Sequence, residues 1–390
     1  MNLRELQVVV ACVASRFGTS TVFPFLQQQL DKSVEFSTPV TSYRSLQEGV
    51  FLLRNEFPLY SGGVVHHAPL LVALISVFNS ETMVSLLYAC ADALVAYQLI
   101  AMAKYFRSSS LPSWVPGALY VINPLVLLSS VSKSSIVFSN LAISTALLTA
   151  LQGNWVCSAV SIAVASYLSL YPLTLIVPLL ALLRNHKLKT LSTAAVTLAA
   201  LLLSSYKQND ESWNYLFSTY GVIMTFSKII PNLGLWWYFF VELFEMFIPF
   251  FKAVFNLFAV SCIIPFSLRF HKQPFYAFLL CLFWITLTKP YPTLGDGGFL
   301  LSFIPFFKPL YGYFRYSVIS TLLFIHVSVL SPIFYHLWVD LGSGNSNFFY
   351  AISLVYALGL ATVLVDLVWA MLRIEYDKGK PNLHLKLTPI

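Results

Sequence analysis

The sequence predicts an all-α polytopic membrane protein with about twelve transmembrane helices. Its composition, its apolar runs and the charges of its loops all favour this class. Of the 390 residues, 58% are hydrophobic and only 10% are charged, and the mean hydropathy is +0.75. Soluble domains carry roughly 25% charged residues. No polar stretch is long enough for a separate soluble domain, so we expect a single transmembrane domain over residues 1–390.

The first quarter of the chain holds two expected spans separated by one long polar region. Leu6–Leu26 is the first span, and the absence of a small-residue cleavage site after it favours a retained signal anchor. Residues 27–80 form the polar region, in which Ser42–Arg54 has the pattern of a short amphipathic helix on the membrane surface. Thr82–Ala103 is the second span.

Ten further apolar segments complete the expected bundle. Several are shorter than the ~20 residues that a straight span needs, so ten spans is the alternative count. Prolines interrupt some of them, which membrane helices tolerate when neighbours satisfy the backbone. The segments lie at about 113–131, 134–151, 154–171, 172–183, 190–206, 235–268, 274–288, 298–314, 317–338 and 348–372.

Lys and Arg gather in alternate loops, which sets the expected orientation. The basic segments are residues 104–112, 184–189, 269–273 and the tail 373–390. Positive loops favour the cytosolic side, so both termini are predicted to be cytosolic. Five polar segments then share the opposite side: the loops at about 27–80, 207–232, 289–298 and 340–347, and the short turn near Lys133. The net charge of +7 follows from these basic loops, and no basic run with interleaved aromatics predicts nucleic-acid binding.

Nothing in the sequence predicts a metal site, a cofactor or a catalytic residue. The five cysteines are isolated in apolar segments, without a C-x-x-C pair or a Cys/His cluster, so we expect small buried side chains. His66 and His67 adjoin a turn, and structural packing is favoured over catalysis. Asp92 and Asp366 lie within apolar spans, where an acid is a functional hypothesis by default, although Asp366 is near the cytosolic end.

Glu242 and Glu245 stand out inside the aromatic run of the span at 235–268. They are three residues apart, so on a helix they share a face. An ionised acid at the bilayer centre costs about 2.5–3.5 kcal/mol, so the pair is expected to face protein, water or a ligand. The alternative is an interfacial helix end that pairs with Lys228 or Lys252. Acid–base catalysis is disfavoured because no nucleophile accompanies the pair.

Two further polar loops carry candidate ligand contacts. Asp296 lies in Lys289–Gly298, where Gly and Pro predict a fixed turn. It either binds a cation or a sugar hydroxyl or, as favoured, satisfies backbone N–H groups of the turn. In Gly342–Asn347 the amides suit sugar hydroxyls or phosphate oxygens. We expect Asn345 to be a ligand contact and Asn347 to be either a helix cap or a second contact.

Several ordered blocks resemble the U subunit of glycosylphosphatidylinositol (GPI) transamidase, the PIG-U family. The resemblance covers almost the whole chain and has the character of the fungal members. Its blocks are Ser37–Gly49, Tyr60–His66 with Pro69, Ser169–Leu175, Pro231–Glu245, Tyr291–Asp296, His336–Trp338 and Gly342–Ile352.

The resemblance implies a multi-pass protein of the endoplasmic reticulum membrane with a glycosyltransferase-C-like bundle, similar to mannosyltransferases that use dolichol-phosphate mannose. It implies a non-catalytic subunit that helps to present the GPI lipid, beside a caspase-like catalytic subunit and accessory membrane subunits. The implied GPI contacts are the polar positions that match the family pattern: Asn345, Asn347, Glu242, Glu245, Asp296 and His66.

The main rival is a mannosyltransferase of GPI or lipid-linked sugar assembly. Such enzymes need an acidic motif, often D-x-D-like, in the first lumenal loop. That loop offers Asp31, Glu35, Glu48 and Glu56, and the chain contains no D-x-D. We therefore expect a transferase-like scaffold without transferase chemistry. A transporter or lipid flippase is a third class, and neither an internal repeat nor a clear charged pathway supports it.

Overall fold

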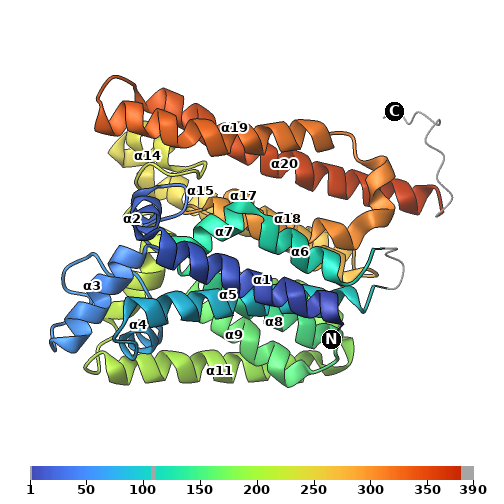
Figure 1. The fold of residues 1–390 in the computed structure, drawn as a ribbon, viewed down its shortest axis with the longest axis horizontal. Coiled ribbons are helices and arrows are strands. Elements are labelled where there is room, and N and C mark those ends of the chain that lie inside the picture. The colour runs from blue at the N-terminus through green and yellow to red at the C-terminus, as the bar shows by residue number, and fades with distance from the viewer. Residues whose placement is uncertain (1, 107–110, 379–390) are drawn as a thin grey trace.

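The computed structural model describes residues 2–106 and 111–378, which form helices and loops with no strand among them. This result confirms the all-α class. Most helices run roughly along the long axis of the molecule, and α1 begins at the end where α20 finishes (Figure 1). The predicted tail 373–390 and the basic loop 104–112 lie partly outside the described residues.

The first half of the chain contains helices of very unequal length. They are α1 (Leu3–Val22), α2 (Pro24–Lys32), α3 (Tyr43–Arg54), α4 (Pro69–Ser76), α5 (Glu81–Ala103), α6 (Trp114–Ile122), α7 (Pro124–Val131), α8 (Ile136–Leu151), α9 (Trp155–Leu168), η1 (Tyr171–Leu175), α10 (Ile176–Leu182), η2 (Arg184–His186) and α11 (Lys187–Gln208). The amphipathic helix predicted at Ser42–Arg54 is α3, and the span predicted at Thr82–Ala103 is α5.

The second half begins with short pieces and ends with two long helices. They are α12 (Asn214–Leu216), η3 (Phe217–Gly221), α13 (Val222–Thr225), α14 (Trp237–Glu242), η4 (Glu245–Phe247), α15 (Ile248–Ser261), α16 (Ile263–Arg269), α17 (Pro274–Thr288), α18 (Leu294–Leu301), η5 (Ile304–Tyr313), α19 (Ser317–Tyr335), η6 (His336–Asp340) and α20 (Ser346–Tyr376).

By length and composition, five helical stretches among the described residues can cross a membrane, or seven if each bent pair counts as one span. The five are Glu81–Ala103, Arg184–Gln208, Glu245–Arg269, Ser317–Asp340 and Ser346–Tyr376. The bent pairs are α1 with α2, at 91°, and α6 with α7, at 61°. Four shorter apolar stretches account for most other predicted spans. The count of twelve therefore stays a prediction.

Both bends occur at an X-Pro step. Phe23 precedes Pro24, and Asn123 precedes Pro124. Proline lacks an N–H and pushes the preceding residue away from helical geometry. Asn123 accordingly has an extended ψ of 115°, and its side chain accepts a hydrogen bond from Leu125 N at 3.0 Å. Pro124 therefore causes the break between α6 and α7, and Asn123 caps the start of α7.

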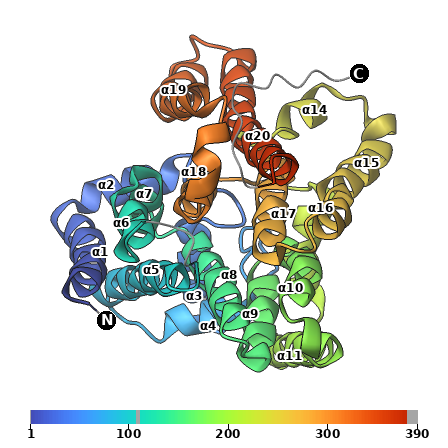
Figure 2. The ribbon, with the colours of Figure 1, turned by 90° about the vertical axis from the view of Figure 1, so that its right-hand side faces the viewer.

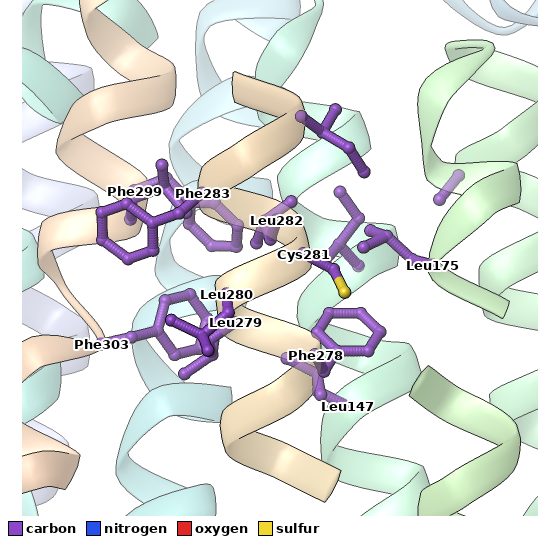
Figure 3. Packing of buried hydrophobic residues seen from close by; sticks show 14 of the residues in the cluster. Leu147, Leu175, Phe278, Leu279, Leu280, Cys281, Leu282, Phe283, Phe299 and Phe303 are labelled. Carbon is purple, nitrogen blue, oxygen red and sulfur yellow. The ribbon is translucent and has the colours of Figure 1, made fainter. Parts of the chain in front are cut away.

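Helix α17 lies at the centre of the hydrophobic core (Figure 3). Phe278, Leu280 and Cys281 are each fully buried. Around them, side chains converge from α8, η1 and α18. The buried thiols Cys12 and Cys281 match the predicted apolar role, whereas Cys90 and Cys157 are exposed. This core fixes the loops that connect the helix ends.

Candidate functional site

The predicted polar loops meet at the end of the molecule opposite the start of α1. The Glu35 carbonyl accepts a hydrogen bond from Leu294 N at 2.8 Å, so the first polar loop contacts the start of α18. The Glu35 carboxylate is buried and accepts hydrogen bonds from the hydroxyls of Ser33 and Ser331, the latter on α19. The loop 27–80 is therefore held between α18 and α19.

Gly234 allows a second pair of loops to approach closely. A Cβ at this position would lie 2.9 Å from the Pro290 carbonyl oxygen. The Asn232 carbonyl accepts from the Ser353 hydroxyl at 2.9 Å, and the Trp236 indole donates to Thr288 O at 2.6 Å. Loops 207–232 and 289–298 are thereby joined to each other and to α20.

An aromatic cluster covers the junction between α14 and the start of α20. Trp237 is buried and stacks on Trp338, with ring centroids 5.9 Å apart. Tyr238 stacks on Tyr350 at 4.5 Å and 14°, and the Tyr350 hydroxyl donates to Leu235 O at 3.2 Å. Trp237 and Tyr238 of α14 therefore form a packed cluster with partners on η6 and α20.

The amide roles differ from the prediction. Asn345, expected as a ligand contact, is the N-cap of α20, and its Oδ1 accepts from Asn347 N at 3.1 Å and Phe348 N at 3.3 Å. Asn347, expected as a cap or contact, instead accepts a hydrogen bond from the Tyr238 hydroxyl. Both side chains are exposed, so each still presents its amide NH₂ group to the surroundings.

The prediction that Glu242 and Glu245 share a helix face is wrong. Helix α14 ends at Glu242, Leu243 and Phe244 are extended, with ψ of 137° and 139°, and Glu245 begins the separate turn η4. The physical reason is the break at Leu243 and Phe244: the helical stretch able to cross a membrane begins only at Glu245 and runs to Arg269, and α14 is a separate short helix before it. Both acids are exposed.

Neither acid forms an ion pair within 4.0 Å with a described cation, so the predicted partners Lys228 and Lys252 do not pair with them. Glu242 instead lies beside Tyr238. Both residues are on α14, and the Glu242 carboxylate interacts electrostatically with the Tyr238 hydroxyl. A polar edge thus runs from Glu242 through Tyr238 to Asn347.

His66 lies away from that edge, in a small polar crevice. Its Nδ1 donates to Ser218 O at 2.8 Å, and burial lowers the pKa of the imidazole. The crevice also contains Tyr171, Lys289 and Tyr291. The buried Tyr291 hydroxyl has no hydrogen-bond partner at normal geometry in the described chain, although the Lys228 backbone is near enough to influence it electrostatically. The cavity measures about 40 Å³, which is room for a few water molecules but not for a sugar.

Asp296 has the structural role that the sequence favoured. It occupies the third position of α18, and its Oδ2 accepts from Thr293 N at 2.8 Å, which completes a capping box. Its Oδ1 pairs with Lys289 Nζ at 2.6 Å. It lines a second cavity of about 30 Å³ that shares Tyr171 and Lys289 with the His66 crevice. Of the six predicted site residues, Glu242, Asn345 and Asn347 therefore lie at the exposed edge, His66 and Asp296 lie apart from it, and Glu245 is on the separate turn η4.

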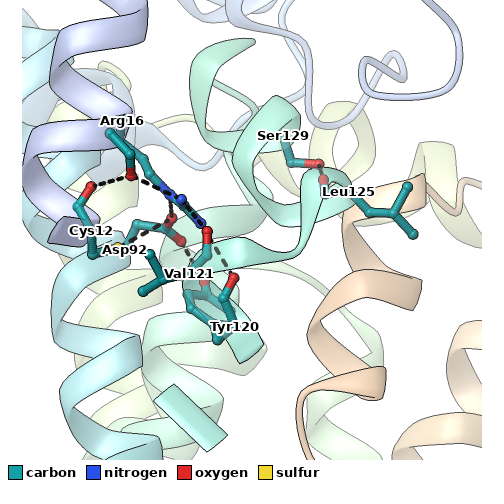
Figure 4. A network of polar contacts seen from close by, with 8 residues as sticks. Cys12, Arg16, Asp92, Tyr120, Val121, Leu125 and Ser129 are labelled. Carbon is teal, nitrogen blue, oxygen red and sulfur yellow. Dashed lines mark hydrogen bonds and ion pairs between the residues drawn. The ribbon is translucent and has the colours of Figure 1, made fainter. Parts of the chain in front are cut away.

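A buried ion pair joins Asp92, which the sequence singled out, to Arg16, which the sequence analysis did not identify as its partner. Asp92 on α5 is 0% exposed and pairs with Arg16 on α1, which is 1% exposed, at 2.7 Å (Figure 4). Arg16 also donates to Val121 O at 2.6 Å, where α6 ends, and the Tyr120 hydroxyl donates to Asp92. The sequence did contain an indication of this pair, because Arg16 is a lone charge within an otherwise apolar run and such a charge needs a partner.

Asp366, the other intramembrane acid, is also structural. Its carboxylate accepts from Arg315 N at 3.1 Å and Tyr316 N at 2.8 Å, just before α19 begins. It therefore caps α19 from α20. No group of three or more His, Cys, Asp or Glu side chains with metal-binding geometry occurs among residues 2–106 and 111–378.

Comparisons with known proteins agree over the whole chain. The family model described as GPI transamidase subunit PIG-U matches residues 10–356. The chain is 58% identical to GPI transamidase component GAB1 of Saccharomyces cerevisiae, with 100% of both chains covered. It is 32% identical to GPI-anchor transamidase component PIGU of Mus musculus, covering 95% of this chain and 93% of the relative. It is 29% identical to the GAB1 homolog of Schizosaccharomyces pombe, covering 93% of each.

Proposed function

The chain belongs to the PIG-U family of GPI transamidase subunits, and we propose that it is a non-catalytic subunit of that complex, which binds the GPI lipid and presents it for attachment to protein C-termini. The observation that carries the proposal is the match to transamidase components from end to end. Its partners are then a caspase-like catalytic subunit and accessory membrane subunits, in the endoplasmic reticulum membrane.

The arrangement of the loops supports a multi-pass protein with both termini on one side. Residues of the basic segments form ion pairs at the end where α1 starts: Lys104 pairs with Glu5 of α1 at 2.9 Å, and Arg269 pairs with Glu375 of the tail at 2.8 Å. The polar loops meet at the opposite end, as the contacts of Glu35 and Gly234 illustrate. Under the positive-inside rule the first end is cytosolic and the second lumenal. Twelve crossings, several of them by short or broken helices, fit this alternation.

The exposed edge of Glu242, Tyr238, Asn345 and Asn347 has chemistry suited to the head of a GPI lipid. Amide NH₂ groups donate to sugar hydroxyls and phosphate oxygens. Carboxylates attract an ammonium group such as that of phosphoethanolamine. The underlying cluster of Trp237, Tyr350 and Trp338 holds the edge on a rigid base. The role of this surface is to position the lipid head, while the bond exchange takes place on the catalytic subunit.

Depletion of the chain tests the function at the level of the pathway. We expect complete GPI lipid to accumulate while proproteins retain their C-terminal signals. Accumulation of an under-mannosylated GPI precursor would instead identify a mannosyltransferase, and normal attachment would refute both. Co-purification of a caspase-like subunit with the tagged chain is the matching biochemical measurement.

The amides require a test that separates capping from ligand contact. Asn345→Ser keeps a capping oxygen but removes the NH₂ donor, whereas Asn345→Ala removes both and costs about 1 kcal/mol of helix stability. We expect both variants to assemble with the partner subunits and both to lower GPI attachment in membranes. If Asn345→Ser attaches GPI normally and only Asn345→Ala is impaired, the residue is a cap and the contact is refuted.

Asn347 permits the same separation with a different substitution. Asn347→Asp keeps the oxygen that accepts from Tyr238 but loses the NH₂ donor. Its expected phenotype is intact assembly with reduced attachment. Tyr238→Phe serves as the control for loss of the hydrogen bond alone. If Asn347→Asp and Tyr238→Phe impair assembly equally, Asn347 and Tyr238 have a structural role and the proposed ligand contact of Asn347 is refuted.

A further inference from the structure

A cavity that shares no lining residue with this edge lies along helix α19. Its volume is about 420 Å³. Helix α19 stands at the border of the bundle beside α20 and α18 (Figure 2). The cavity is lined by one face of α19, by the start of α7 and by parts of α18, η5 and α20. We call it the α19 groove.

The α19 groove is built for an apolar occupant. Most polar side chains in its wall are already hydrogen-bonded within the protein. Ser328 donates to Phe324 O at 2.8 Å, and Ser320 bonds to Thr362 at the same distance. The Asp366 carboxylate caps α19. Because these groups are satisfied, the groove offers a ligand mainly carbon surface.

The groove opens toward the membrane. Ser317–Asp340 is one of the stretches long and apolar enough to cross a bilayer. Ile325 and Val329, which line the groove, are 53% and 54% exposed. The lining residues on α19 run from Ser317 to Val329, a rise of about 18 Å. Half the hydrocarbon core is about 15 Å, so the groove has the length of the acyl chains in one leaflet.

Its size favours a lipid chain over a protein helix. An apolar cavity of 150 Å³ holds benzene, so by proportion 420 Å³ holds a chain of roughly 17 carbons. One turn of α-helix with its side chains fills a cylinder 10–12 Å wide and 5.4 Å long, or roughly 400–600 Å³. A partner's transmembrane helix would therefore fit only one turn into the groove.

A positively charged side chain, Arg315, lies at one end of the groove, next to the start of α19. Arg315 lies between the lining residues Phe314 and Ser317, and its guanidinium stacks on Trp369 with 3.8 Å to the ring centroid. The side chain is exposed and forms no ion pair within 4.0 Å with a described carboxylate. Arg and Trp together are typical of the headgroup level of a membrane.

From this combination we propose that the α19 groove holds one acyl chain of an anionic phospholipid whose phosphate binds Arg315. The groove supplies the apolar contacts, and the guanidinium supplies a charge-assisted hydrogen bond to the phosphate. Its positive charge also favours a headgroup with net negative charge, such as that of phosphatidylserine, over zwitterionic phosphatidylcholine, which carries the same phosphate. The lipid wedges between α19 and the rest of the bundle and fills space that would otherwise remain unpacked. The site lies in the leaflet opposite the edge of Asn345 and Asn347, so it is independent of the proposed GPI contact.

The test measures phospholipid that remains with the complex. Complexes are purified in mild detergent through a tag on this chain, incubated with mixed micelles of phosphatidylserine and phosphatidylcholine, and analysed for bound lipid by mass spectrometry. Ser328→Phe fills the groove and is expected to remove about one lipid per complex, whereas Ser328→Ala is expected to retain it. Arg315→Gln is expected to lower the ratio of phosphatidylserine to phosphatidylcholine at this site about fivefold. Arg4→Gln, an exposed arginine at the same end, is the matched control.

Three results would overturn the proposal. The first is a full lipid complement in a folded Ser328→Phe complex. The second is loss of a partner subunit from that variant with lipid content unchanged, which would place a protein helix in the groove. If Ser328→Phe does not fold, Arg315→Gln decides the question, because it alters only an exposed side chain. An unchanged lipid ratio is then the third contrary result, and a fivefold fall supports the proposal.

Discussion

Individual buried charges in this chain stabilise irregular backbone. Arg16 neutralises Asp92 and also donates to the carbonyls of Tyr120 and Val121, which end α6 before the proline break. A helix end buried in an apolar bundle needs such donors, because its last carbonyls have no intrahelical partner. Asp366 performs the complementary task for the N–H groups that precede α19.

Asp92→Asn is expected to destabilise the protein by about 3–5 kcal/mol, because it leaves the Arg16 charge uncompensated. Thermal denaturation of the detergent-solubilised complex, followed by size-exclusion chromatography, measures the loss. The double variant Arg16→Met with Asp92→Leu should recover part of the stability. The recovery stays incomplete because the carbonyls at the end of α6 still lack donors. Wild-type stability in Asp92→Asn would show that the pair has no structural role.

His67 gives the chain a defined dependence of stability on pH. The ring is buried, and its Nε2 donates to Ser42 O at 2.8 Å. Desolvation by burial lowers the pKa of His67 from 6.5 to about 4. The folded protein therefore binds fewer protons than the unfolded chain between these values, and stability falls as the pH drops from about 6.5 to about 4. The full loss is on the order of 3 kcal/mol.

His67→Gln provides the corresponding measurement. The glutamine amide keeps an N–H donor for the Ser42 carbonyl but cannot take up a proton in this range. Denaturation midpoints at pH 7 and pH 5 should therefore differ less in this variant than in the wild type. The same difference in both proteins would assign the acid sensitivity to other groups.

At the scale of elements, glycines and prolines decide where helices break and how closely they pack. The segment Lys289–Gly298, predicted to be a turn, is a turn only up to Thr293, where α18 begins. A Cβ on Gly295 would meet Ser129 Oγ of α7 at 2.1 Å, and one on Gly298 would meet Leu125 Cβ at 2.9 Å. Small residues at these positions let the two helix backbones approach.

Gly295→Ala is accordingly expected to cost about 1–3 kcal/mol through overpacking against α7. Because Ser129 is the obstacle, Gly295→Ala combined with Ser129→Gly should melt closer to the wild type than either single variant. Gly312→Ala is a suitable control, because a Cβ there meets nothing within 4 Å. A melting temperature unchanged in Gly295→Ala would mean that α18 shifts away from α7 without cost.

The sequence predicted correctly the helices that depend on a local pattern of apolar residues. The amphipathic pattern of Ser42–Arg54 and the apolar run of Thr82–Ala103 appear as α3 and α5 at nearly those bounds. The span predicted at 235–268 is present only in part: Glu245–Arg269 is long and apolar enough to cross a membrane, whereas Trp237–Glu242 is a separate short helix. The apolar composition is the same on both sides of the break at Leu243 and Phe244, so the sequence pattern could not locate it. The capping role of Asn345 depends on where α20 begins, a boundary that the repeated Asn-x-Asn pattern leaves open.

Across the whole molecule, polar groups separate into two ends. The predicted lumenal side gathers Glu35, His66, Asp296 and the Asn345 edge, and the opposite end gathers the ion pairs of Lys104 and Arg269. Short helices between the ends are consistent with a protein whose neighbours in a complex help to shield its polar backbone. The distribution of Lys and Arg among alternate loops predicted this separation, because consecutive loops lie at opposite ends of a helical bundle.

Site-specific labelling tests the twelve-span orientation. In a background whose native cysteines are replaced by alanine, single cysteines are placed at four exposed positions: Arg4, Asp210, Lys272 and Ser343. In sealed microsomes with their cytosolic face outward, a membrane-impermeant maleimide should label the cysteines at Arg4 and Lys272. Those at Asp210 and Ser343 should react only after detergent is added, because the proposed orientation places them on the lumenal side. If the cysteine at position 210 is labelled in sealed vesicles, residue 210 lies on the cytosolic side. The chain before it must then cross the membrane an even number of times, in place of the seven crossings that the twelve-span orientation requires. That outcome would favour ten spans and place the loop 207–232 in the cytosol, away from the Asn345 edge.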